Sequence, residues 1–83
     1  MQAALADYDE TVRIAPDHAD AHVNRGVLYL GLGNTEKARD DFNRAIELNP
    51  RYAEALAYRG ALSLATGDAK TAVADCTAAI AVN

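Results

Sequence analysis

The chain repeats itself with a period of 34 residues. The segment RGVLYLGLG at residues 25–33 returns as RGALSLATG at residues 59–67. About a dozen positions are identical when residues 19–49 are aligned with residues 53–83. Self-similarity at such a period is typical of repeat proteins, in which a small motif completes its core only by stacking on its neighbours. A chain of 83 residues has room for little more than two such units.

The N-terminal stretch matches the second half of the unit. The matched pairs are Ala4 with Ala38, Asp7 with Asp41, Tyr8 with Phe42, Val12 with Ile46, Ile14 with Leu48, and Pro16 with Pro50. We therefore interpret the chain as a single domain over residues 1–83. It consists of a half repeat (1–18), a full repeat (19–52) and a nearly full repeat (53–83).

Each unit is predicted to form two helices. Apolar residues recur at three- and four-residue spacing among strong helix formers. Gly33 and Gly67 can adopt the left-handed conformation that ends a helix, and Asn34 and Asp68 can cap the next one. A proline closes the half unit and the full unit, because proline cannot continue a helix. The expected helices are residues 3–14, 19–31, 35–48, 53–65 and 69–82, with no strand.

This arrangement resembles the tetratricopeptide repeat over nearly the whole chain. That unit has a small residue in its first helix, an alanine early in the second, an aromatic residue, another alanine and a closing proline. The full unit supplies Gly26, Ala38, Phe42, Ala45 and Pro50. The next unit supplies Gly60, Ala72, Cys76 and Ala79, and the half unit Ala4, Tyr8, Thr11 and Pro16.

Several positions depart from that pattern. His22 and Leu56 replace the usual Trp or Tyr, Arg25 and Arg59 replace Leu, and Cys76 replaces the aromatic residue. We expect these changes to weaken local packing while the period and the small-residue contacts persist. Gly26 and Gly60 are expected to let the two helices of a unit approach closely, because a larger side chain would hold them apart.

The resemblance implies an all-α fold, a right-handed α-solenoid of antiparallel helix pairs with about two and a half units and five helices. It also implies a protein–protein interaction module that binds a peptide or extended segment in the concave groove lined by the first helices. Carried onto this sequence, the peptide-binding residues are Asp20, Val23, Asn24, Val27, Leu30, Glu54, Ala57, Tyr58 and Ala61. Structural packing alone is the competing interpretation of Asn24.

Chaperone-binding members of the family grip a C-terminal carboxylate with Lys and Arg on the neighbouring first helix. Here the matching places hold Glu54 and Tyr58, so the carboxylate clamp is absent. A groove that carries Asp20 and Glu54 is instead expected to accept a basic or neutral segment of a protein or peptide partner. The net charge of −4 argues against nucleic acid or an anionic membrane as partner, because both favour a basic face.

Three features invite a catalytic or metal-binding interpretation. His18 and His22 are four residues apart, but His22 occupies a packing position, so a structural pair is favoured over a metal site. Cys76 has no histidine nearby in the sequence and is expected to fill the core. Asp40 and Asp41 lie among basic residues and are expected to be solvated. We predict no enzyme activity and no cofactor.

The ends of the array suggest an alternative function. Internal repeats present apolar faces to their neighbours, so an array needs polar caps. Candidate uncovered residues are Leu5, Tyr8 and Val12 at one end and Val73, Ala74, Ala78 and Ala81 at the other. Either the chain is an excerpt of a longer array or it self-associates as a structural, self-assembling piece. The sequence shows neither a signal peptide nor a membrane span, so a soluble, cytoplasmic protein is expected.

Overall fold

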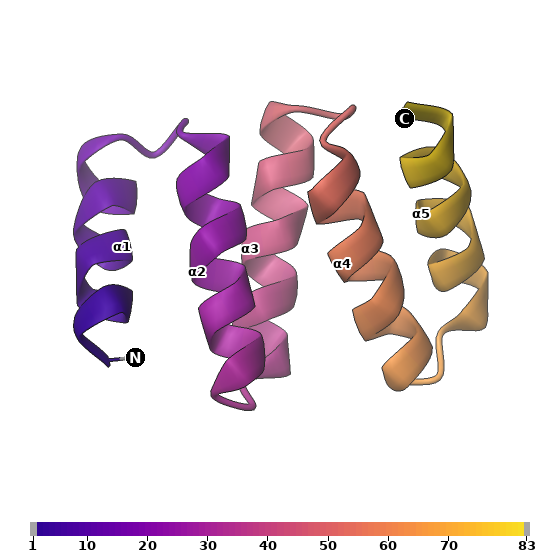
Figure 1. Cartoon of the computed structure of the whole chain (residues 1–83), viewed down its shortest axis with the longest axis horizontal. Coiled ribbons are helices and arrows are strands. Elements are labelled where there is room, and N and C mark those ends of the chain that lie inside the picture. The colour runs from indigo at the N-terminus through magenta and orange to yellow at the C-terminus, as the bar shows by residue number, and fades with distance from the viewer. Residues whose placement is uncertain (1, 83) are drawn as a thin grey trace.

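The computed structural model describes residues 2–82, and in that range it contains five α-helices and no strand. The helices are α1 (Gln2–Ile14), α2 (Ala19–Gly31), α3 (Thr35–Leu48), α4 (Ala53–Ala65) and α5 (Ala69–Val82). They stand side by side and antiparallel in chain order along the long axis of the molecule (Figure 1). The prediction of an all-α solenoid of five helices is confirmed.

The turns within each unit follow the predicted chemistry. Gly33 and Gly67 have φ angles of 81° and 87°, which only glycine adopts without strain. Asn34 then accepts a hydrogen bond from the backbone N–H of Lys37 at 3.2 Å. Asp68 accepts one from Thr71 at 3.1 Å, and hydrogen bonds from Thr71 lower the pKa of its carboxyl group. These caps begin α3 and α5 where the sequence predicted them.

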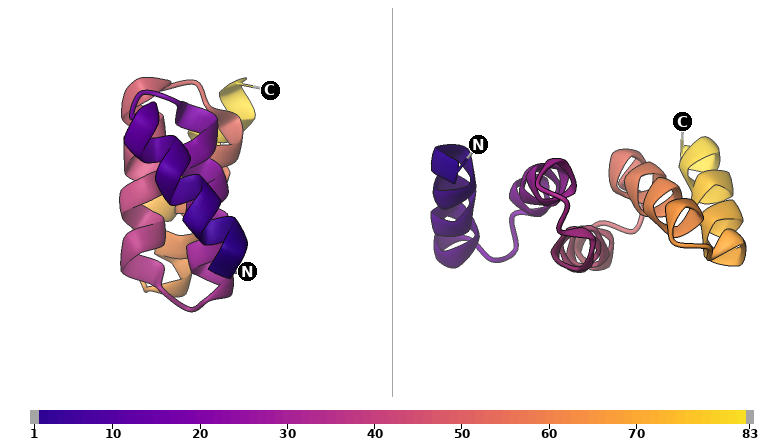
Figure 2. Two further views of the ribbon diagram at one scale, coloured as in Figure 1. Left: turned by 90° about the vertical axis from the view of Figure 1, so that its left-hand side faces the viewer. Right: turned by 90° about the horizontal axis from the view of Figure 1, so that it is seen from below.

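The three central helices lie in two layers. Seen from below, α2 and α4 lie in one layer and α3 lies in the other (Figure 2). Each helix contacts the next along the chain, most extensively within the pairs α2–α3 and α4–α5. The layer of first helices therefore includes both elements that carry the predicted binding residues.

The core is centred on Phe42 of α3, which is fully buried. Val23, Ala45, Ala55 and Leu62 surround it together with Ala38. A Cβ atom built onto Gly26 would lie 2.7 Å from Cε1 of Phe42, so no other residue fits there without displacing the ring. At Gly60 the corresponding atom would lie 3.0 Å from Sγ of Cys76 and 3.3 Å from the backbone oxygen of Ala72. The predicted close approach of paired helices is confirmed.

The outer face of α5 is apolar and exposed. Val73 and Ile80 lie on it with 66% and 76% of their surface accessible, and Cys76 is exposed as well. The prediction that Cys76 fills the core is wrong. Its counterpart Phe42 is covered by the following helix α4, whereas no described helix follows α5. At the other end, Leu5, Tyr8 and Val12 of α1 are half-buried.

No helix in residues 2–82 combines the length and apolar character needed to cross a membrane.

Candidate functional site

The predicted binding residues divide by exposure. Asp20, Asn24, Val27, Glu54, Ala57, Tyr58 and Ala61 are exposed. Val23 is buried in the core, and Leu30 is half-buried against it. Val23 therefore presents little surface, and Leu30 serves mainly to pack α2. The open surface is therefore formed by the seven exposed residues, of which Val27, Ala57 and Ala61 are aliphatic and the others are polar or aromatic.

A pocket of about 300 Å³ brings five of these residues together with three that were not predicted. It lies among α1, α2 and α4. Its lining consists of Ala4, Tyr8, Val23, Asn24, Val27, Leu28, Glu54 and Tyr58. The ring of Tyr58 stacks on Phe42 with a centroid distance of 5.4 Å and an interplanar angle of 7°. Because Phe42 is fully buried, this stack fixes one wall of the pocket.

A second depression, of about 620 Å³, adjoins the first through Glu54. Asp20, Glu54 and Ala57 are the predicted binding residues that line it. Asn49, Arg51, Tyr52, Ala53 and Ala79 complete the lining. Leu30 and Ala61 line neither cavity.

Tyr52 joins the two repeats at this depression. Its hydroxyl donates a hydrogen bond of 2.5 Å to Oδ1 of Asp20, 32 residues away in the chain. Burial, this hydrogen bond and the negative charges of Asp20 and Glu54 raise the pKa of Tyr52 to about 12. The phenol of Tyr52 is therefore a neutral donor at physiological pH.

Tyr8 lines the smaller pocket, although the sequence analysis did not include it among the candidate binding residues. It was assigned to an uncovered end, yet it lines the pocket beside Asn24. The 34-residue repeat could have predicted this position. Tyr8 and Asn24 are the counterparts of Phe42 and Tyr58, and these two rings stack in the next unit. Moving the contact between Phe42 and Tyr58 back by 34 residues places Tyr8 next to Asn24.

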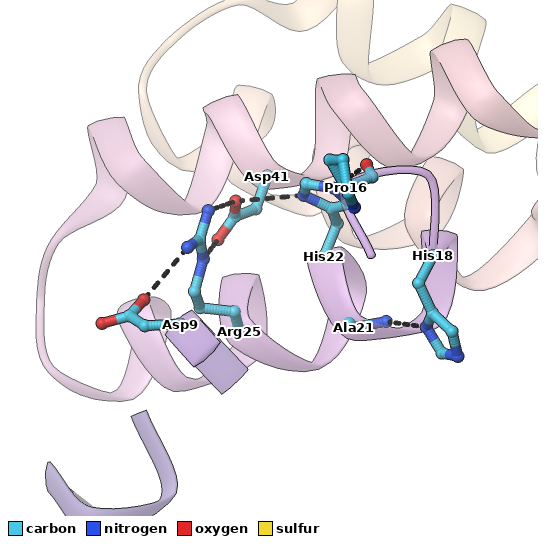
Figure 3. A network of polar contacts seen from close by, with 7 residues as sticks. All are labelled: Asp9, Pro16, His18, Ala21, His22, Arg25 and Asp41. Carbon is cyan, nitrogen blue, oxygen red and sulfur yellow. Dashed lines mark hydrogen bonds and ion pairs between the residues drawn. The ribbon is translucent and has the colours of Figure 1, made fainter. Parts of the chain in front are cut away.

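A largely buried ion pair between the first and second helices repeats in both units. Arg25 donates to both carboxylate oxygens of Asp41, at 2.9 and 2.6 Å, and to Asp9 of α1 at 3.0 Å (Figure 3). Arg59 makes the same two bonds to Asp75, each at 2.7 Å, and a third to Asn43. The pKa of each arginine is raised, mainly by its hydrogen bonds to the aspartate.

This ion pair corrects two sequence interpretations. Asp41 was expected to be solvated, but only 3% of its surface is exposed. Arg25 and Arg59 were expected to weaken packing, yet each links its own unit to the preceding helix of the chain. The sequence did hint at this pair, because both the arginine and the aspartate recur after 34 residues, as Arg59 and Asp75.

The two histidines have structural contacts. Nδ1 of His18 accepts a hydrogen bond of 3.1 Å from the backbone N–H of Ala21 and so caps α2. His22 is buried as predicted, and its Nε2 donates to the carbonyl oxygen of Pro16 at 2.9 Å (Figure 3). Its Nδ1 lies 3.6 Å from Asp41 and has no hydrogen-bond partner, so the expected satisfied pair is incomplete. No group of three potential metal ligands occurs within residues 2–82.

Two family models match the sequence. Both describe a tetratricopeptide repeat, one over residues 19–52 and the other over residues 42–74. Together they cover residues 19–74. No curated protein matches the chain significantly.

Solved structures share the fold over almost the entire chain. A structure described as the second TPR of Spaghetti (RPAP3) bound to the HSP90 peptide SRMEEVD has a TM-score of 0.93 and 26% identity. The comparison covers 99% of this chain and 76% of that one. Two structures of MamA, one of them the RS-1 ArsTM double mutant, give TM-scores of 0.92 with 23% and 26% identity over 98% of this chain. The chain spans about half the length of these MamA chains, 47% and 46%.

Proposed function

The chain belongs to the tetratricopeptide repeat family, and from this premise we propose that it is a non-catalytic interaction module that binds an extended basic or neutral peptide segment. The segment lies along the layer of α2 and α4, across the two adjoining depressions. The observation that carries this proposal is that the two depressions are neighbours, because Glu54 lines both of them.

The charges along this surface favour a basic segment. Asp20 and Glu54 occupy the same position in successive repeats, so a negative charge recurs along the groove. Of the nearby cations, Arg25 and Arg59 are held by buried aspartates. Arg51 is the basic side chain that lines the larger depression. Charge complementarity of this kind governs orientation and association rate.

The similar RPAP3 structure provides an informative contrast. The peptide named with it, SRMEEVD, carries three acidic side chains among its last four residues. Glu54 and Tyr58 stand where the clamp of chaperone-binding relatives has basic residues, so an acidic peptide would meet a like charge here. We therefore propose that this chain selects against that class of tail.

A matched peptide series tests the proposal. Fluorescence anisotropy would compare labelled SRMEEVD with a charge-reversed peptide, SRMKKVK amide, and one in which amide side chains replace the acidic ones, SRMQQVN amide. All three peptides share the arginine at the second position. We expect the basic peptide to bind about tenfold more tightly than the acidic one at low ionic strength, with the difference shrinking as salt screens it.

Two charge-reversal variants locate the effect. Glu54→Lys should remove most of the preference for the basic peptide. Glu36→Lys, which changes the net charge equally but lies at the exposed start of α3, should leave that preference nearly unchanged. Equal binding of all three peptides, or equal effects of the two variants, would contradict a groove that selects by charge.

Self-assembly through α5 is a second candidate function. Val73 and Ile80 are exposed. One repeat earlier their counterparts are Arg39, which donates a hydrogen bond to Thr66 at the end of α4, and Ile46, which packs against the core. A second copy that supplies a first-type helix would continue the same interface. Because the side chains of α5 are mostly small, the apolar area available is limited and we expect weak association.

Sedimentation velocity over a wide range of protein concentration tests this candidate. We expect the mean mass to rise with concentration and Ile80→Asp to abolish that rise. Leu32→Asp, which also alters an exposed apolar residue but lies at the end of α2, should not affect it. A wild-type protein that stays monomeric throughout would exclude self-assembly.

A further inference from the structure

The residues that line the smaller depression include more than is needed to hold a peptide backbone. Valine and alanine side chains form part of its wall, two tyrosine rings form another part, and a carboxylate and an amide lie among them. No lysine or arginine lines it. Apolar walls beside a single negative charge match a side chain with a long apolar stem and a positive end.

Glu54 supplies an available negative charge. Among the described residues it takes part in no ion pair, whereas Asp41 and Asp75 are each paired with an arginine. Glu54 and Tyr58 are four residues apart on α4, so their side chains lie on the same face of the helix. The carboxylate therefore lies next to the aromatic wall without a cation of the protein to neutralise it.

The aromatic walls come from two different elements. Tyr58 is held against Phe42 by parallel stacking, and Tyr8 lines the same pocket from α1. α1 is itself tied to α2 by the bond between Arg25 and Asp9. The rings are thus positioned before any ligand binds. Aromatic faces attract ammonium and guanidinium groups, more strongly when water is excluded.

The volume fits one side chain. A pocket of about 300 Å³ has room for one long side chain. We propose that this pocket is a subsite for one lysine or arginine side chain of the bound segment. The stem lies against Val27 and the tyrosine rings, and the cation lies between Glu54 and Asn24. This inference rests on the proposed function, because it names the side chain that the groove selects.

The test uses small probes, so it does not depend on the sequence of the natural segment. Acetyl-arginine amide, acetyl-lysine amide and acetyl-norleucine amide would be titrated into the ¹⁵N-labelled full chain and followed by NMR. Norleucine retains the apolar stem and lacks the charge. We expect the two cationic probes to shift the backbone amides of Tyr8, Asn24, Val27 and Tyr58 and to bind at least about fivefold more tightly than norleucine.

Matched variants separate the contribution of the Glu54 carboxylate from that of the Tyr8 ring. Glu54→Gln should weaken the cationic probes about fivefold and leave norleucine unchanged, while Glu36→Gln should affect neither. Tyr8→Leu, which keeps an apolar side chain, should weaken the cationic probes through loss of the ring. Thermal melts would establish that each variant is folded. Equal affinity for norleucine and arginine, or shifts distributed over all acidic surfaces, would overturn the subsite.

The peptide series distinguishes the two proposals. If SRMKKVK amide binds the groove and the cationic probes do not map to this pocket, the subsite is wrong and the proposed function stands. If the probes map to the pocket and no peptide binds, the proposed function is wrong and the preference of the pocket for a basic side chain stands.

Discussion

Replacing Phe42 with alanine is expected to lower the free energy of unfolding by about 3–5 kcal/mol, the usual cost of truncating a fully buried phenylalanine. Phe42 is the largest fully buried side chain, it is packed against Gly26, and it supports the ring of Tyr58. Alanine would leave a cavity that neither neighbour can fill. Small domains have about 5–15 kcal/mol of stability in total, so this change removes much of it. Urea denaturation followed by circular dichroism measures the loss.

The matched control is Cys76→Ala, at the same position one repeat later. Cys76 is exposed, so its truncation should change the free energy of unfolding by no more than about 0.5 kcal/mol. A loss at Cys76 comparable to that at Phe42 would show that α5 is covered in solution. A small loss at Phe42 would contradict its central place in the core.

Asp41→Ala is expected to lower the free energy of unfolding by about 3 kcal/mol, near the lower end of the cost of removing one partner of a buried ion pair. The side chain of Asp41 is 4% exposed, and the variant would leave Arg25 without its two hydrogen bonds to this carboxylate. The lower end applies because the Arg25 side chain is 21% exposed and retains Asp9 as a partner.

Asp40→Ala is the control for that variant. Asp40 is adjacent in sequence, is exposed and carries the same charge, so its loss should cost no more than about 0.5 kcal/mol. Similar values for the two variants would show that the bidentate pair contributes no more than a surface charge. The same urea titration provides both measurements.

The sequence by itself determined where the helices begin and end and where the paired helices approach closely. Gly33 and Asn34, like Gly67 and Asp68, end one helix and begin the next through contacts within a few residues. Gly26 and Gly60 indicate where paired helices approach closely, because glycine lacks the Cβ atom that would hold two crossing helices apart. Such features are local or repeat with the period, so they can be found without knowing the three-dimensional arrangement. The candidate binding residues exposed on α2 and α4 were proposed through the family resemblance.

Only the tertiary structure decided which equivalent residues are buried. Phe42 and Cys76 hold the same place in the repeat, but α4 covers the first and no described helix covers the second. Asp41 was indistinguishable from Asp40 in a charged helix until α2 placed Arg25 beside it. Tyr8 entered the pocket because α1 packs next to α2. Burial and ion pairing depend on what lies across an interface, and a residue's own neighbours in the chain do not specify that.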